Sequence, residues 1–337
     1  MSTEKLIIAG SVLGVSLGLA TYLTLLERKL AAWLQDRIGP NRAGPGGILQ
    51  PIADGVKLLF KEEFIPAKAN KFLFILGPSL AMLLACMGGA MLPWGKGLII
   101  GGKEISMAVA DVNVGLLYMF AVVSLGAYGI MIGGWASNNK YSLMGAIRAA
   151  SQIISYELAM GLAIIALVIG TGSLSLSEIA AQQSGWHWNI VYQPLGFLIF
   201  VICAFAETNR APFDLPECET ELIGGYHTEY GSMKLGFYLF AEYVNMFISS
   251  ALMSTLYFGG YNMPFIGRLG LAHNVETILG TVFLFAKIAG FIFLFMWVRW
   301  TLPRFRYDQL MNLGWKMLIP LAIVNLLLTG AIRLWLF

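Results

Sequence analysis

The chain has 337 residues, of which 58% are hydrophobic and only 12% are charged, and its mean hydropathy is +0.72. Soluble globular proteins are about 45–50% apolar and about 25% charged. This composition excludes an ordinary cytosolic enzyme, a disordered protein and a nucleic-acid binder, and it leaves a polytopic membrane protein. The net charge is only +3, so the positions of individual charges carry more information than their sum.

The cysteine and glycine patterns bear on cofactors. Cys86, Cys203 and Cys218 are isolated, with no Cys-x-x-Cys spacing and no histidine pair nearby. An iron–sulfur cluster needs about four thiolates, and no glycine-rich dinucleotide fingerprint follows a strand pattern. We therefore expect this chain alone to bind no metal, Fe–S cluster, FMN or NAD.

Apolar segments long enough for membrane helices, which need about 20 residues, recur along the whole chain. The first runs directly into Glu27-Arg28-Lys29 and lacks a small-residue cleavage site, so we interpret it as a retained helix and not as a signal peptide. The pattern predicts an all-α polytopic membrane protein, a single integral membrane domain over 1–337, with about eight transmembrane helices at 6–26, 72–92, 112–133, 144–170, 189–206, 236–258, 276–299 and 315–336.

The basic residues predict an orientation. Sixteen of the 22 Lys and Arg residues lie in or beside the loops that follow the first, third, fifth and seventh spans. Five lie on the opposite side, and Lys287 lies inside a span. Cytoplasmic loops carry the excess of Lys and Arg. We therefore expect cytoplasmic loops at 27–71 and 207–235 and both termini on the outer side.

The first cytoplasmic loop contains an amphipathic pattern. Pro51 suits the first turn of a helix, and the pattern predicts a helix lying in the membrane interface. It is either a surface anchor, which the pattern alone favours, or one lip of an opening for a lipid-soluble molecule. The apolar positions at helical spacing are Ile48, Leu49, Ile52, Val56, Leu59, Phe60 and Phe64.

Several ionisable residues lie inside the predicted spans, where a charge costs at least about 2.5–3.5 kcal/mol. Glu157, Glu242 and Lys287 lie within spans, Arg148 opens the fourth span and Glu207 closes the fifth. They are either paired charges that fix helix packing or a path for protons or ions through the bundle. Ionisable residues at this depth favour the path.

The third cytoplasmic loop, 206–231, is unusually acidic for its side of the membrane. It has a single arginine, Arg210, and apolar residues alternate with its acids. It is either a solvated acidic loop or a packed element whose carboxylates have raised, coupled pKa values and respond to nearby charge. The interleaved apolar residues favour the packed element. The six carboxylates are Glu207, Asp214, Glu217, Glu219, Glu221 and Glu229.

At these charged stretches the sequence resembles a known family. It is similar to the H subunit of proton-pumping NADH:quinone oxidoreductase, respiratory complex I, the counterpart of mitochondrial subunit one. The resemblance covers nearly the whole chain. Its motifs are ERKLAAWLQDRIGPNRAGPGGILQPIADGVKLLFKE (27–62), WASNNKYSLMGAIRAASQIISYE (135–157), AETNRAPFDLPECETEL with GYHTEYG (206–231), AEYVN (241–245) and LPRFRYDQLMNLGWK (302–316).

The resemblance implies that the subunit forms the floor and membrane entrance of a quinone chamber and couples quinone reduction to proton translocation. The amphipathic helix then becomes a lip of the entrance. Residues near the chamber would be Glu27, Arg28, Arg37, Asp54, Phe64, Asp214, Glu217, Glu219, Glu221, Glu229, Arg299 and Arg304. The proton path would contain Glu157, Glu207 and Glu242, with Arg148 and Lys287 as basic partners.

The resemblance also implies a cellular location, partners and a substrate. The chain would have no independent activity and would lie in a bacterial plasma membrane. Its partners would be the peripheral subunits of the quinone site, the neighbouring small membrane subunits and lipid. Quinone would be its substrate, with ubiquinone and menaquinone both open.

Three rival interpretations remain open on the sequence alone. The main rival is the quinone-independent anchor subunit of a membrane-bound energy-converting hydrogenase. A purely structural anchor would tolerate neutral substitution of the buried glutamates. An independent secondary transporter is disfavoured, because the sequence shows no convincing internal repeat.

Overall fold

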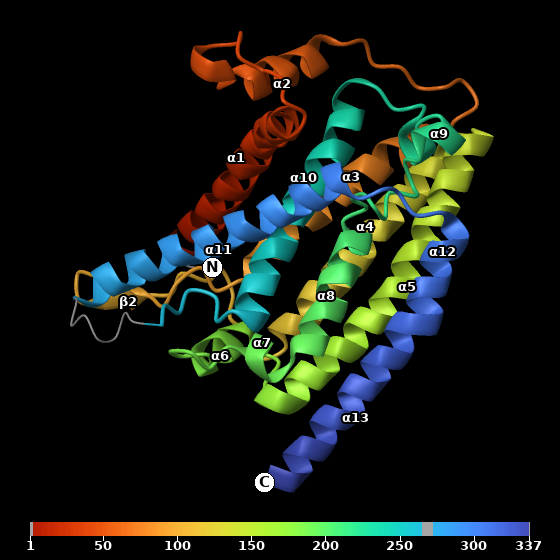
Figure 1. The fold of residues 1–337 in the computed structure, drawn as a ribbon. Coiled ribbons are helices and arrows are strands. Elements are labelled where there is room, and N and C mark those ends of the chain that lie inside the picture. Colours follow the sequence, from red (N-terminus) through yellow and green to blue (C-terminus); the bar gives the residue numbers. More distant parts are fainter. Residues whose placement is uncertain (1–2, 265–271, 337) are drawn as a thin grey trace.

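The computed structural model describes residues 3–264 and 272–336, and in this part of the chain helices dominate (Figure 1). Seven helical segments there are long and apolar enough to cross a membrane, which confirms the all-α polytopic membrane fold. They are α1 (Thr3–Leu34), α3 (Lys71–Gly88), α4 (Gly115–Ala136), α5 (Lys140–Thr171), α10 (Ser232–Tyr257), α11 (His273–Thr301), and the segment made of α12 (Tyr307–Asn312), a π-helical turn (Leu313–Leu318) and α13 (Ile319–Leu336).

The segment expected at 189–206 differs from a single long span. It consists of α7 (Asn189–Tyr192) and α8 (Pro194–Glu207), separated by Gln193. Proline lacks a backbone N–H and suits a helix start, so a new helix begins at Pro194. With 14 residues, α8 is about 21 Å long, shorter than the roughly 30 Å hydrocarbon core of a bilayer.

The predicted amphipathic helix is present as α2 (Gln50–Phe60), with Pro51 in its first turn. It lies at the end of the bundle where α1 ends (Figure 1). Its apolar side chains Ile52, Leu59 and Phe60 are exposed, Phe60 to 88%. Such an apolar surface on a membrane protein fits contact with lipid at the interface.

Short elements cover the two ends of the bundle. The α2 end also carries α9 (Glu219–Leu222) and the 3₁₀ turn Gly225–His227, whereas α6 (Leu176–Gln182), α7 and the C-terminus lie at the opposite end (Figure 1). A hairpin of β1 (Leu98–Ile100) and β2 (Lys103–Ile105) pairs Leu98 with Ile105 and packs by the start of α11. Its Gly101-Gly102 turn has positive φ at both residues, as tight hairpins prefer.

Helix α3 packs closely against both α4 and α10. A Cβ at Gly129 would lie 2.8 Å from the backbone nitrogen of Ala81, so only glycine allows this approach of α4 to α3. Tyr238 on α10 donates a hydrogen bond to the carbonyl oxygen of Gly129 at 3.0 Å. This unit holds α10, which carries Glu242, at a fixed distance from α4.

Candidate functional site: buried charges at the α2 end

The loop that follows α8 is packed, not solvated. Phe213, Leu215 and Tyr226 are buried among the neighbouring helices, although Ile223 is 64% exposed. Gln152 on α5 donates from Nε2 to the carbonyl oxygens of Ala206 and Phe213, each at 2.7 Å. The interleaved apolar residues therefore pack against the bundle, as their pattern predicts.

A glycine on α5 makes the close approach of this loop possible. A Cβ at Gly145 would lie 2.7 Å from the backbone nitrogen of Tyr226 and 2.8 Å from the carbonyl oxygen of Pro216. Both distances are too short for any larger residue. The loop backbone therefore lies directly against α5, and Tyr226 turns into the bundle.

Glu27 is the centre of a buried ion cluster that joins three helices to the loop. It is 4% exposed. Its carboxylate accepts hydrogen bonds from Arg210 at 2.9 Å, from Arg299 at 2.5 Å and from the hydroxyl of Tyr243 at 2.9 Å. Burial disfavours the charge of Arg210, but the Glu27 carboxylate holds its pKa above the usual value. One carboxylate facing two arginines leaves this cluster with a net positive charge.

Asp214 is a buried acid of the loop and pairs with Arg304 at 2.8 Å. Burial and the neighbouring carboxylate of Glu217 raise its pKa to about 7, although Arg304 acts in the opposite direction. Its Oδ1 atom is buried and has no hydrogen-bond partner among the described residues. Asp214 is therefore a carboxyl group that exchanges its proton near neutral pH.

A tyrosine connects the loop with the carboxylates of the spans. The Tyr226 hydroxyl donates a hydrogen bond to Oε1 of Glu242 at 3.2 Å. Burial raises the pKa of Tyr226 well above its usual value, so it remains a donor. His227, beside it, has Nδ1 3.6 Å from Oε1 of Glu217. This hydroxyl–carboxylate contact joins the loop to Glu242, beside the ring contacts of Tyr226 and Tyr230 with Tyr238 on α10.

Two of the predicted proton-path acids line one small cavity. Glu207 and Glu242 lie on the wall of a space of about 40 Å³, together with Thr208, Asn209 and Asn245. A water molecule needs roughly 10–15 Å³ of such volume and several polar partners. Glu157 is close enough to Glu207 for the two carboxylates to interact, so the structure brings all three acids into one region.

The two predicted basic partners are not beside these acids. Arg148 pairs with the exposed Glu221 at 2.5 Å. Lys287 donates to the carbonyl oxygens of Phe258, Gly260 and Asn262 at 2.6, 2.7 and 3.2 Å, at the end of α10 remote from the loop. Phe258 caps α10, and Gly260 and Asn262 follow it, so the ammonium group binds backbone carbonyls of the turn just beyond the helix end.

The remaining predicted chamber residues lie at the α2 end but outside the buried cluster. Arg28 on α1 pairs with Asp54 on α2 at 2.6 Å, and Arg37 donates to Gln35. Phe64 follows α2 and is exposed. These positions form the more open part of the same end.

The other two acids of the loop have different surroundings. Glu229 accepts a hydrogen bond from Nδ2 of Asn139 at 2.6 Å, which ties the loop to the start of α5. Glu219 begins α9, and its side chain lies outside what the structure describes.

Comparison with known proteins places the chain in a family. The family described as NADH dehydrogenase matches residues 6–330. The chain belongs to the NADH dehydrogenase family. Similar members include an H subunit of the NADH-quinone oxidoreductase of Cytophaga hutchinsonii, 70% identical over 97% of this chain and 96% of that protein, and the H subunit of the NADH-quinone oxidoreductase of Flavobacterium psychrophilum, 63% identical over 97% and 96%. NADH-quinone oxidoreductase subunit 8 of Rhodothermus marinus is 48% identical over 96% and 95%.

Sequence reasoning missed two residues that organise the site of this NADH dehydrogenase family member. Gln152 anchors the loop to α5, and the signal for it is an amide inside a predicted span, where polar groups seek partners. Tyr243 binds both Glu27 and the face of Arg210, whose Cζ lies 4.3 Å from the ring centre. It stands in the AEYVN motif, next to Glu242.

Metal-ligating side chains are dispersed in the described part of this family member. Over residues 3–264 and 272–336, no three His, Cys, Asp or Glu side chains are grouped in a way that would hold a metal ion.

Proposed function

We propose that this chain is the H subunit of a bacterial NADH–quinone oxidoreductase, a multi-pass membrane subunit that acts only within the assembled enzyme. The names of relatives that are 48–70% identical over nearly the whole chain support this assignment. The same names favour it over the hydrogenase anchor subunit, because none of these three relatives is named as a hydrogenase.

The α2 end is the proposed wall and membrane entrance of the quinone site. The apolar surface of α2 and the exposed Phe64 fit a passage for a lipid-soluble molecule. The Arg28–Asp54 pair fixes α2 to α1 at its rim. Behind this rim, the positive cluster around Glu27 and the acids of the loop provide polar groups for a quinone headgroup, which becomes more basic on reduction.

The contact between Tyr226 and Glu242 is the observation that carries the coupling role. Reduction of a quinone takes up two electrons and two protons, so the charge next to the loop would change. In surroundings of low dielectric constant, this change of charge acts more strongly on nearby ionisable groups. Asp214, with a pKa of about 7, is suited to give or take a proton in response. A shift of the loop would reach Glu242 through Tyr226 and bias its state.

The assignment also implies partner subunits and an orientation in the membrane. The proposed partners are the peripheral subunits that complete the quinone site, the small membrane subunits and lipid. The loops at 27–71 and 207–235 would face the cytoplasm, because the loops on their side of the membrane together hold 16 of the 22 Lys and Arg residues, and both termini would face outward.

Neutral substitutions in the assembled enzyme test the coupling proposal. E242Q and E157Q should each lower proton pumping and NADH:quinone turnover in proteoliposomes, whereas E104Q, an exposed change on β2 at the other end, should leave both unchanged. Unaltered pumping in E242Q and E157Q would contradict the path and support a purely structural anchor.

A photoreactive quinone tests the wall of the site. It should label residues of 27–64 or 207–230, in competition with inhibitors of quinone reduction. Labelling confined to other subunits would remove the proposed wall role and leave the family assignment intact.

A further inference from the structure

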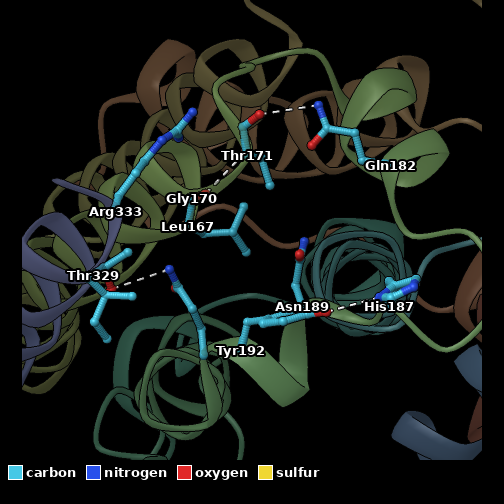
Figure 2. A pocket seen from close by; sticks show the side chains of 11 residues that line it. Leu167, Gly170, Thr171, Gln182, His187, Asn189, Tyr192, Thr329 and Arg333 are labelled. Carbon is cyan, nitrogen blue, oxygen red and sulfur yellow. Dashed lines mark hydrogen bonds between the residues drawn. The ribbon is translucent and has the colours of Figure 1, made fainter. Parts of the chain in front are cut away.

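A pocket of about 390 Å³ with both polar and apolar lining side chains lies at the end of the bundle opposite α2, between α7 and the ends of α5 and α13 (Figure 2). Its lining contains one permanent charge, Arg333, and no carboxylate. The other polar lining side chains include Gln182, His187 and Tyr192, and Leu167 and Ile332 supply an apolar side. None of these residues belongs to the proposed quinone site.

Arg333 is available to a ligand. Among the described residues it makes no ion pair and no side-chain hydrogen bond, and it is only partly exposed. A Cβ at Gly172 would lie 3.5 Å from its Nη2 atom, which places the guanidinium beside the residue that ends α5. A cation at helix C-termini is favourable in itself, but that role does not require a pocket of this size.

The opposite wall is pre-formed. Nδ1 of His187 and the hydroxyl of Tyr192 lie 3.0 Å apart and hydrogen-bond to each other. Figure 2 shows this pair across the pocket from Arg333. Because one group of the pair donates to the other, the pair offers a ligand one further donor: the Tyr192 hydroxyl when Nδ1–H donates to it, or Nε2–H of His187 when the hydroxyl donates to Nδ1. A ligand between the two walls would therefore meet the planar Arg333 cation on one side and one neutral donor on the other, and a phosphate group can accept from both.

The surroundings place this pocket at the level of lipid headgroups. The pocket lies at the ends of membrane-crossing helices; the exposed Tyr192 lines it, and the exposed Trp335 lies in the same last turns of α13 as Arg333. Tryptophan and tyrosine are enriched where the membrane meets water. The exposed Ile332 continues from the pocket along α13 and offers a surface for an acyl chain. A free phosphate ion would make no use of this apolar side.

We propose that this pocket binds the phosphodiester headgroup of an anionic phospholipid, with Arg333 as the main contact. The phosphate would lie between Arg333 and the His187–Tyr192 pair, and an acyl chain would follow Ile332. This site is independent of the proposed quinone chemistry at the other end of the bundle.

Photo-crosslinking in the intact enzyme tests the proposal. The full complex in phosphatidylcholine nanodiscs would be given a phosphatidylglycerol that carries a diazirine near the glycerol, and labelled peptides would be mapped by mass spectrometry. We expect labelling within 167–193 and 329–335. Because charge-assisted hydrogen bonds are the strong ones, R333Q should lower this labelling about tenfold, and R333K should retain part of it.

Matched controls decide the outcome. K5Q removes one exposed positive charge from the N-terminal part of α1, away from the pocket, and should leave labelling unchanged. If R333Q does not assemble, Y192F removes a single hydroxyl and should lower labelling about threefold. Equal labelling in wild type and the pocket variants, or an equal loss in K5Q, would overturn the proposal. Displacement of the lipid by inorganic phosphate would show a free-anion site and overturn the lipid assignment.

Discussion

Glu27 on α1 and Arg210 in the loop after α8 are 183 residues apart in sequence, yet their side chains form a buried ion pair of 2.9 Å. Both are less than 5% exposed. Arg299 on α11 occupies the other carboxylate oxygen at 2.5 Å. A single carboxylate therefore holds the loop against two helices, and the loop's position depends on it.

Replacing Glu27 by glutamine should destabilise the subunit more than any surface change. E27Q would leave Arg210 and Arg299 without their carboxylate, and breaking a buried pair in this way costs about 3–5 kcal/mol. The midpoint of thermal unfolding of the purified enzyme should fall clearly. E276Q breaks the more exposed pair with Lys96 at the other end and should cost only about 0–1 kcal/mol. Equal midpoints for the two variants would show that Glu27 does not anchor the loop.

Asp214 should make the stability of the loop depend on pH. Its pKa is about 7 in the fold, raised above the usual value of 3.8 mainly by burial. Because the folded state holds the proton more tightly, stability should fall as pH rises from about 4 to about 7 and then level off. D214N should remove that part of the dependence. Infrared spectroscopy should show a protonated carboxyl band that disappears near pH 7 in wild type and is absent from D214N throughout.

Hydropathy could predict most of the helices, because a helix that crosses a membrane needs a run of about 20 apolar residues. In the hydrocarbon core, a helix also supplies the hydrogen bonds that the backbone N–H and C=O groups need. The same rule does not show that the run at 189–206 is divided into two helices. The residues are mostly apolar, but Pro194 begins a new helix and leaves α8 with only 14 residues. The proline is visible in the sequence, whereas the resulting break at Gln193 depends on how α7 and α8 pack.

The buried charges of the candidate site could be found in the sequence, whereas their pairings could not. The acids of the 206–231 loop and the spans are conspicuous because charge is scarce in this chain. That Arg148 pairs with Glu221 depends on three-dimensional proximity. Sequence reasoning matches Lys287 with carboxylates because it considers side chains alone, whereas the partners of Lys287 are backbone carbonyls. Every residue has a backbone carbonyl, so the residue types in the sequence do not reveal which carbonyls bind Lys287.

The contact between Tyr226 and Glu242 predicts a separation of binding from coupling. Y226F removes one hydroxyl and leaves the buried ring in place. If the loop acts on Glu242 through this hydroxyl, Y226F should lower the number of protons pumped per NADH oxidised while the KM for quinone stays near the wild-type value. Y128F, an exposed change on α4, is the matched control. Full pumping in Y226F would show that coupling does not pass through this contact.

Lys287 gives a prediction that separates a structural role from a role in the proton path. In K287M, the carbonyl oxygens of Phe258, Gly260 and Asn262 lose the ammonium that now binds them. Hydrogen bonds to charged groups contribute about 1.5–3 kcal/mol each, so the thermal midpoint of the enzyme should fall. The protons pumped per NADH by the molecules that remain folded should stay unchanged, because the nearest groups to Lys287 are carbonyls and not the three acids. A loss of pumping at an unchanged thermal midpoint would instead place Lys287 in the proton path.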